Sequence, residues 1–163
     1  MECRQNPLGN WQNNCKYHHL MGVDARRVLI ADSDAALRQQ LFSALLQEDI
    51  YSDCVASTAD ALARLDEEHY GLLLVDVGLP PGDVDSVIAR IHQMPVAQRP
   101  VVLVLAAKPE AAKTLDVDIV QIVLRRPVLL RQLVDIVRSC LRSAAGAAPV
   151  IEPLPPNGDQ LMS

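Results

Sequence analysis

The feature that most constrains the fold is a regular alternation between short aliphatic segments and longer segments with helical periodicity. The expected strands are residues 28–31, 51–56, 72–75, 101–105 and 119–124. Between them, apolar residues recur every three or four positions, as Leu37, Leu41 and Leu45 do. Parallel strands need right-handed crossovers, which place helices on both faces of a sheet. The alternation therefore predicts an α/β domain with a doubly wound, five-stranded parallel sheet.

Local sequence signals indicate where the expected helices begin and how strongly each helix is predicted. Ser57 and Asp60 form a capping box for the second helix. Residues 110–115 give only a short, weakly patterned fourth helix. Pro127 suits the first turn of the last helix, whose broad apolar face starts at Leu129. These signals predict helices between all five strands.

The composition divides the chain of 163 residues into three parts. Residues 1–24 are rich in Asn, Gln and His without periodicity, so we expect them to be disordered. Residues 26–142 carry the whole strand and helix pattern. Residues 144–163 are rich in Ala and Pro and predict a flexible tail. We therefore expect one domain with tails and no attached output domain.

Charge and hydropathy narrow the classes of partner and compartment. The net charge of −5 and the lack of a basic run argue against nucleic-acid binding. No segment resembles a signal peptide or reaches membrane-spanning length. The four cysteines do not have the spacing of a disulfide framework. These observations predict a cytoplasmic protein that binds neither nucleic acid nor a membrane.

In doubly wound sheets the functional residues follow the carboxyl ends of the strands. The first strand is followed by Asp32-Ser33-Asp34 and the third by Asp76. The fourth is followed by Ala106-Ala107 and the fifth by Arg125-Arg126-Pro127. We therefore expect two carboxylates and a guanidinium to converge at one edge of the sheet.

Four segments, VLIADSD, LLLVDVGLPPGD, VVLVLAA and VLRRPVLL, resemble the motifs of response-regulator receiver domains. The resemblance implies a flavodoxin-like sheet of order 2-1-3-4-5 and a domain that is not an enzyme. It implies that Asp76 accepts a phosphoryl group, with Arg126 in the place of the family lysine. It also implies a Mg²⁺ site formed by Asp32, Asp76 and the backbone carbonyl of Gly78.

The sequence departs from the family at positions that matter for phosphoryl transfer. Ser33 stands where the second acidic residue of the pair is a metal ligand, and a neutral hydroxyl weakens a Mg²⁺ site. Ala106 replaces the hydroxyl residue of the switch, and Val123 replaces its aromatic partner. Arg126 keeps the positive charge but offers a wider, planar set of donors. We therefore expect impaired metal-dependent chemistry.

Two hypotheses for the function of this domain follow. In the first, a stand-alone receiver accepts a phosphoryl group on Asp76 from a histidine kinase or phosphotransfer protein and passes the signal to an unknown downstream protein. In the second, a pseudo-receiver binds partner proteins without phosphorylation. On a purely structural interpretation, Asp76 only caps the following loop, and Asp32 pairs with Arg126 without any metal. A homodimer through the last two helices is compatible with either hypothesis.

Two further classes of site are disfavoured by the sequence. A flavodoxin-like cofactor binder would need a Gly-rich phosphate loop after the first strand, and none is present. A zinc site formed by Cys3, Cys15, His18 and His19 would lack the usual ligand spacing.

Overall fold

The computed structural model describes residues 4–5, 11–12, 27–81 and 84–146 of the chain. The helices and strands, in chain order, are β1 (Arg4–Gln5), β2 (Trp11–Gln12), β3 (Arg27–Ala31), α1 (Ala35–Gln47), β4 (Tyr51–Val55), α2 (Thr58–Glu67), β5 (Leu72–Asp76), α3 (Val84–His92), η3 (Val96–Gln98), β6 (Val101–Ala106), η4 (Pro109–Ala112), β7 (Val120–Arg125) and α4 (Leu130–Gly146).

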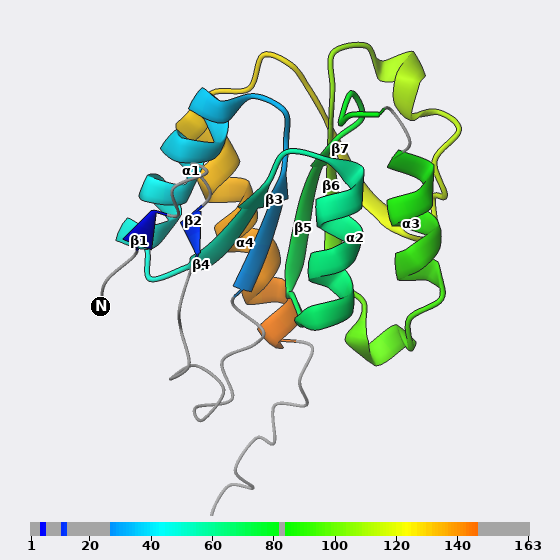
Figure 1. Cartoon of the computed structure of the whole chain (residues 1–163), viewed down its shortest axis with the longest axis horizontal. Coiled ribbons are helices and arrows are strands. Elements are labelled where there is room, and N and C mark those ends of the chain that lie inside the picture. The colour runs from blue at the N-terminus through cyan, green and yellow to red at the C-terminus, as the bar shows by residue number, and fades with distance from the viewer. Residues whose placement is uncertain (1–3, 6–10, 13–26, 82–83, 147–163) are drawn as a thin grey trace, which may run out of the picture.

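Strands β3 to β7 form one parallel sheet in the order β4-β3-β5-β6-β7. This is the predicted order 2-1-3-4-5. Helices α2 and α3 cover one face of the sheet, while α1 and α4 cover the other (Figure 1). All five expected strands are confirmed, with ends that differ by one residue from the predicted ones at most.

Burial along the strands differs between the middle and the edges of the sheet. The central strands β5 and β6 are buried along nearly their whole length. The nearly unbroken aliphatic segment 119–124 is typical of a central strand covered on both faces, but in β7 exposed and partly buried residues alternate, so that interpretation is wrong. The polar and apolar alternation of residues 51–56 predicts an edge strand, and β4 is one, although its residues 52–55 are buried.

A polar cluster at the amino end of β3 accounts for the buried polar residues of β4. Arg27 pairs with Asp53 at 2.8 Å and with Glu68 at 2.8 Å. The Tyr70 hydroxyl donates to Asp53 over 2.7 Å, and the Arg27 guanidinium lies 5.4 Å from the Tyr70 ring centroid. Burial, reinforced by the negative charge of Asp53, raises the pKa of Tyr70. We call these four residues the amino-end cluster.

Helices α1 and α2 begin with capping residues, whereas the two expected helices nearest the C-terminus differ from the prediction. Asp34 and Ser57 cap α1 and α2 by accepting backbone N–H groups. Helix α4 begins at Leu130, so Pro127 precedes the helix rather than forming its first turn. The expected fourth helix at residues 110–115 is only the 3-10 turn η4. That segment has too few apolar residues to hold a full helix against the sheet.

The terminal segments differ in part from the expectation. Within residues 1–24, which were predicted to be disordered, β1 and β2 pair antiparallel. Helix α4 runs to Gly146, beyond the predicted boundary at residue 142. The zinc candidates Cys3, Cys15, His18 and His19, and residues 147–163, lie outside the described residues.

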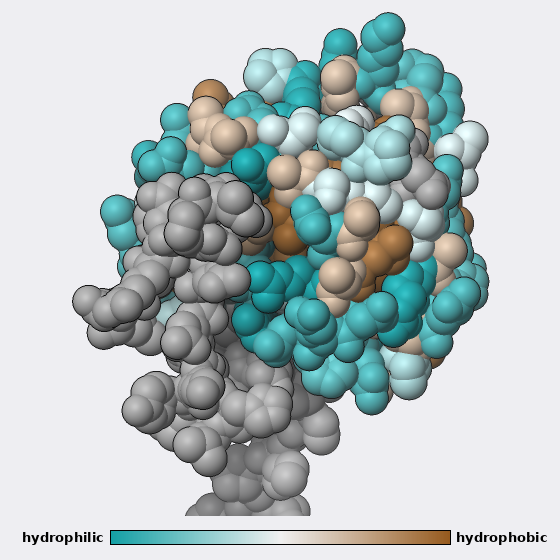
Figure 2. Space-filling model, viewed as in Figure 1, coloured by the Kyte–Doolittle hydropathy of each residue, from teal (hydrophilic) through white to brown (hydrophobic). Residues whose placement is uncertain are grey.

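The face that carries α2 and α3 is mostly hydrophilic, with small apolar areas between the helices (Figure 2). Among the described residues, no helix combines the length and apolar character needed to cross a membrane.

Candidate functional site

Three strand ends bring the predicted site residues together. Asp32 directly follows β3, Asp76 ends the neighbouring strand β5, and Arg126 follows β7 at the edge of the sheet. Arg126 Nη2 donates to Asp32 Oδ2 and lies 3.5 Å from Asp76 Oδ2. The predicted convergence of two carboxylates and a guanidinium is therefore present in the structure.

Asp32 is the most deeply buried member of the site, with 1% of its side chain exposed. Its Oδ1 accepts the backbone N–H of Asp34 over 2.9 Å, and its Oδ2 accepts from Arg126. Burial raises the pKa of the Asp32 carboxyl above its ordinary value, against the lowering effects of the Asp34 N–H and of Arg126. Both carboxylate oxygens of Asp32 therefore already have a protein donor.

Asp76 is more accessible, with 13% of its side chain exposed. Its Oδ1 accepts the backbone N–H of Gly78 over 3.2 Å, while Oδ2 faces Arg126. The loop-capping role expected of a strand-end carboxylate is thus visible, beside the pairing with Arg126.

Arg126 follows β7, which lies two strands from β5 with Asp76 and three strands from β3, which Asp32 follows. Its backbone N–H donates to the Ala106 carbonyl over 2.9 Å, which ties the start of the β7–α4 loop to the end of β6. Ala106 is fully buried, and Val123, the other expected switch position, is 44% exposed on β7. The two positions therefore share no buried environment through which one side chain would push the other.

Arg38 is a site residue that the sequence reasoning missed. Its guanidinium donates to the backbone carbonyl of Asp32 over 2.6 Å. The signal was present, since Arg38 lies one helical turn after Asp34, on the helix that starts at the acidic strand end. A second guanidinium thus contacts the Asp32 segment.

The residues at this edge do not fit a Mg²⁺ ion. Magnesium requires near-octahedral oxygen ligands and is favoured by carboxylates. Asp32 and Asp76 supply two carboxylates here, and Arg126 lies against both of them from one side. The adjacent carboxylate of Asp34 caps α1 instead. Ser33 is exposed and adds no charge. Nowhere among the described residues do three or more His, Cys, Asp or Glu side chains gather closely enough to hold a metal ion.

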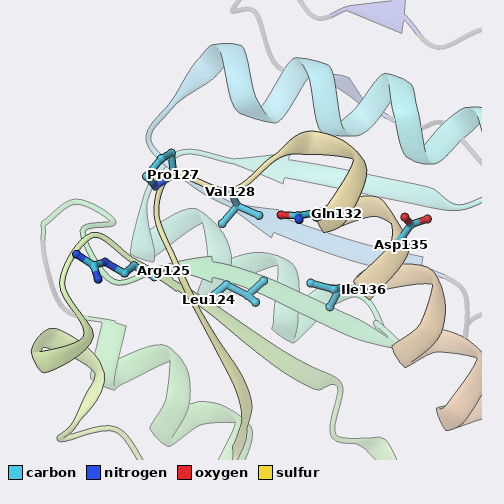
Figure 3. Close-up of a pocket in the computed structure, with 7 residues that line it drawn as sticks. All are labelled: Leu124, Arg125, Pro127, Val128, Gln132, Asp135 and Ile136. Atoms are coloured by element: carbon cyan, nitrogen blue, oxygen red, sulfur yellow. The ribbon is translucent and has the colours of Figure 1, made fainter.

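A groove lies next to the site, between β7 and α4. Its floor includes Leu124, Val128 and Ile136, and its rim carries Gln132 and Asp135 (Figure 3). A second hollow lies on the Arg126 side of the same loop and shares Pro127 and Val128 with the groove. The β7–α4 loop therefore connects the charged site to a partly apolar surface.

Comparisons with known proteins agree with this architecture. The chain is 28% identical over 123 residues to the transcriptional regulatory protein PmrA of Pectobacterium parmentieri, covering 75% of this chain and 55% of PmrA. It is 31% identical over 117 residues to the transcriptional regulatory protein BasR of Escherichia coli K12, covering 71% and 52%. The chain thus spans about half the length of these curated relatives.

The fold also matches solved structures. The response regulator protein TrrA of Thermotoga maritima, solved in complex with Mg²⁺-BeF, superposes with a TM-score of 0.61 at 18% identity. The match covers 71% of this chain and 98% of the TrrA chain. The sequence model described as the response regulator receiver domain matches residues 28–138, more than half of the chain. This chain therefore belongs to the response regulator receiver domain family of two-component signalling.

Proposed function

We propose that this receiver domain signals by binding partner proteins, without metal-dependent phosphoryl transfer to Asp76. The observation that carries the proposal is the position of Arg126, which pairs with Asp32 and lies 3.5 Å from Asp76. Phosphoryl transfer to a carboxylate relies on cations that neutralise the phosphoryl oxygens, commonly Mg²⁺. Here the guanidinium neutralises the acceptor carboxylate itself.

The absence of a built switch supports the same proposal. Ala106 has no hydroxyl to bind a phosphoryl oxygen, and Val123 is half-exposed rather than packed beside it. A phosphoryl group on Asp76 would therefore lack the residues that convert its presence into a change of surface. We propose that partner selection depends on the shape of the unphosphorylated domain, including the groove between β7 and α4.

The proposed partners are a histidine kinase or phosphotransfer protein and a downstream protein, in the cytoplasm. The expected dimer surface of two final helices has only one helix in the described structure, because η4 takes the place of the other. A homodimer would accordingly use α4 and the edge strand β7, along which exposed and partly buried residues alternate.

A second candidate function keeps Asp76 as a working phosphoryl acceptor with impaired metal-dependent chemistry. It is favoured by the place of Asp76 at the end of β5 and by its accessibility, at 13% exposed. In this scheme Asp76 Oδ is the nucleophile, and Arg126 would stabilise negative charge on the phosphoryl group.

Intact mass of the full chain after incubation with acetyl phosphate and Mg²⁺ separates the two functions. The proposed function predicts no phosphoryl mass increment on the wild-type chain. An increment that Asp76→Asn removes, and that the exposed-site control Asp66→Asn retains, would establish the second candidate instead. An increment that persists in Asp76→Asn would overturn both, because the acceptor would then lie elsewhere.

A further inference from the structure

We propose that Arg126 is the permanent cation of this site, and that Arg126 together with Ser33 excludes a divalent metal ion. The inference rests on the proposed function and deepens it, since it assigns a cause to the metal-independent behaviour. It concerns the residues of this chain rather than a bound group.

The first step is the charge balance of the site. Two carboxylates, Asp32 and Asp76, face the single guanidinium of Arg126, so the three side chains carry a net charge of about −1 when all are ionised. A divalent cation between the carboxylates would have to approach the guanidinium at close range. Repulsion between like charges is strong where water is largely excluded, as it is at Asp32.

The second step is the occupancy of the ligand atoms. Asp32 uses Oδ1 to accept from the Asp34 backbone and Oδ2 to accept from Arg126. Asp76 uses Oδ1 to accept from Gly78, and its Oδ2 faces Arg126. A metal ion on Asp32 Oδ2 would compete with a charged hydrogen bond, and such bonds are among the stronger ones. Asp76 Oδ2 lies 3.5 Å from Arg126, which is longer than a good hydrogen bond, so a metal ion on that oxygen would instead lie against the guanidinium.

The third step is the path by which Arg126 reaches the site. The strand order places β6 between β7 and β5, so the Arg126 side chain must pass the end of β6. That end is Ala106, which has only a methyl group and is held to the Arg126 backbone by the 2.9 Å hydrogen bond. Ala106 and Arg126 are thus matched in size: the small residue leaves room for the long one.

A single nitrogen of Arg126 faces both carboxylates, since Nη2 donates to Asp32 Oδ2 and lies 3.5 Å from Asp76 Oδ2. An ammonium group is a compact point charge, whereas the guanidinium is a wider, planar group with several donors in a fixed fork. Arg126 therefore places a wide cation beside both carboxylates, where a metal ion would have to bind. Ser33 completes the arrangement, because its neutral side chain leaves no third carboxylate to offset the positive charge.

Binding of Mn²⁺ to the full chain tests the inference. Electron paramagnetic resonance measures this binding as a loss of the signal of the free ion. The wild-type chain is expected to show no specific binding. Ser33→Asp combined with Arg126→Lys supplies a third carboxylate and removes the fork, so it should bind Mn²⁺ at least about tenfold more tightly. Adding Asp76→Asn to this double variant should abolish the gain.

Equal Mn²⁺ affinity of the wild-type chain and the folded double variant would overturn the inference. If Arg126→Lys prevents folding, as circular dichroism would show, Ser33→Asp combined with Arg126→Ala provides the same comparison without the cation. The proposed function fails separately: phosphorylation of Asp76 in the presence of a metal chelator would overturn that function while leaving metal exclusion intact. If the wild-type chain bound Mn²⁺ but was not phosphorylated, metal exclusion would be overturned while the proposed function would stand.

Discussion

The two ends of strand β3 carry similar pairs of charged residues in different settings. At the amino end, Arg27 pairs with the buried Asp53, and at the carboxyl end, Arg126 pairs with the buried Asp32. The amino-end cluster adds a hydroxyl donor, Tyr70, whereas the other end adds a second carboxylate, Asp76. A buried Asp–Arg pair is therefore no sign of function in itself. Its place at the carboxyl ends of the strands, beside an accessible second carboxylate, is what marks a site.

The largest expected effect comes from removing the cation of the amino-end cluster. Arg27→Met leaves Asp53 buried without its ionic partner, so the free energy of unfolding should fall by about 3 kcal/mol. Urea unfolding followed by circular dichroism measures the loss. A loss below about 1 kcal/mol would show that Asp53 is hydrated, and that the cluster is not the buried structural unit described above.

A smaller loss is expected from the hydroxyl of the same cluster. Tyr70→Phe keeps the ring and deletes only the 2.7 Å hydrogen bond to Asp53. Hydrogen bonds to charged groups contribute about 2 kcal/mol, so the free energy of unfolding should fall by roughly that amount. The same urea titration checks it. A stability equal to that of the wild-type chain would mean that Arg27 alone satisfies Asp53.

The opposite sign is expected at the carboxyl end. Burial raises the pKa of Asp32 in the folded chain, so its contribution to stability is present at low pH and is lost as pH rises through the raised value. Asp32→Asn should therefore unfold at a higher urea concentration than the wild-type chain at neutral pH, by less than the losses above. The difference should disappear below about pH 3, where the carboxyl is protonated in both the folded and the unfolded state.

A pH-independent effect of Asp32→Asn, or a loss of stability at neutral pH, would contradict this assignment. It would place Asp32 with Asp53 as a residue whose charge the fold needs. The contrast between the two ends of β3 would then be one of position alone.

The smallest effect is expected at an exposed pair that calibrates both clusters. Arg90 and Asp66 join α3 to α2 at 2.7 Å, but the Asp66 side chain is 59% exposed and the Arg90 side chain is 34% exposed. Arg90→Gln should change the free energy of unfolding by less than about 0.5 kcal/mol. A larger change in the urea midpoint would mean that proximity of charges, rather than burial, determines the effect of Arg27→Met.

Much of the fold was predictable because the signals are local. Aliphatic segments such as 101–105 are typical of central parallel strands, and Asp34 and Ser57 cap the helices that they precede. The errors arose where a distant residue determines the outcome. The polar and apolar alternation of β4 correctly indicated an edge strand, but it did not show that Asp53 is buried, because Arg27 and Tyr70, from other parts of the sequence, supply its partners.

The candidate site was predictable as a set of residues but not as a set of contacts. The strand ends placed Asp32, Asp76 and Arg126 at one edge, as the structure has them. Whether Arg126 contacts the carboxylates depends on side-chain reach across β6 and on the size of Ala106, which strand periodicity does not contain. The contribution of Arg38 was missed although its position, one helical turn after Asp34, is visible in the sequence.

The contact between Asp32 and Arg126 joins residues 94 positions apart, which gives it a particular place in the folding reaction. Contacts between distant residues form after the local units, because the closure of a long loop opposes them. This pair closes only when the last strand has docked, so it should be unformed in the transition state. Removing the Arg126 guanidinium, which leaves Asp32 buried without its partner, should speed unfolding while leaving the refolding rate nearly unchanged. The guanidinium thus lengthens the lifetime of the folded domain.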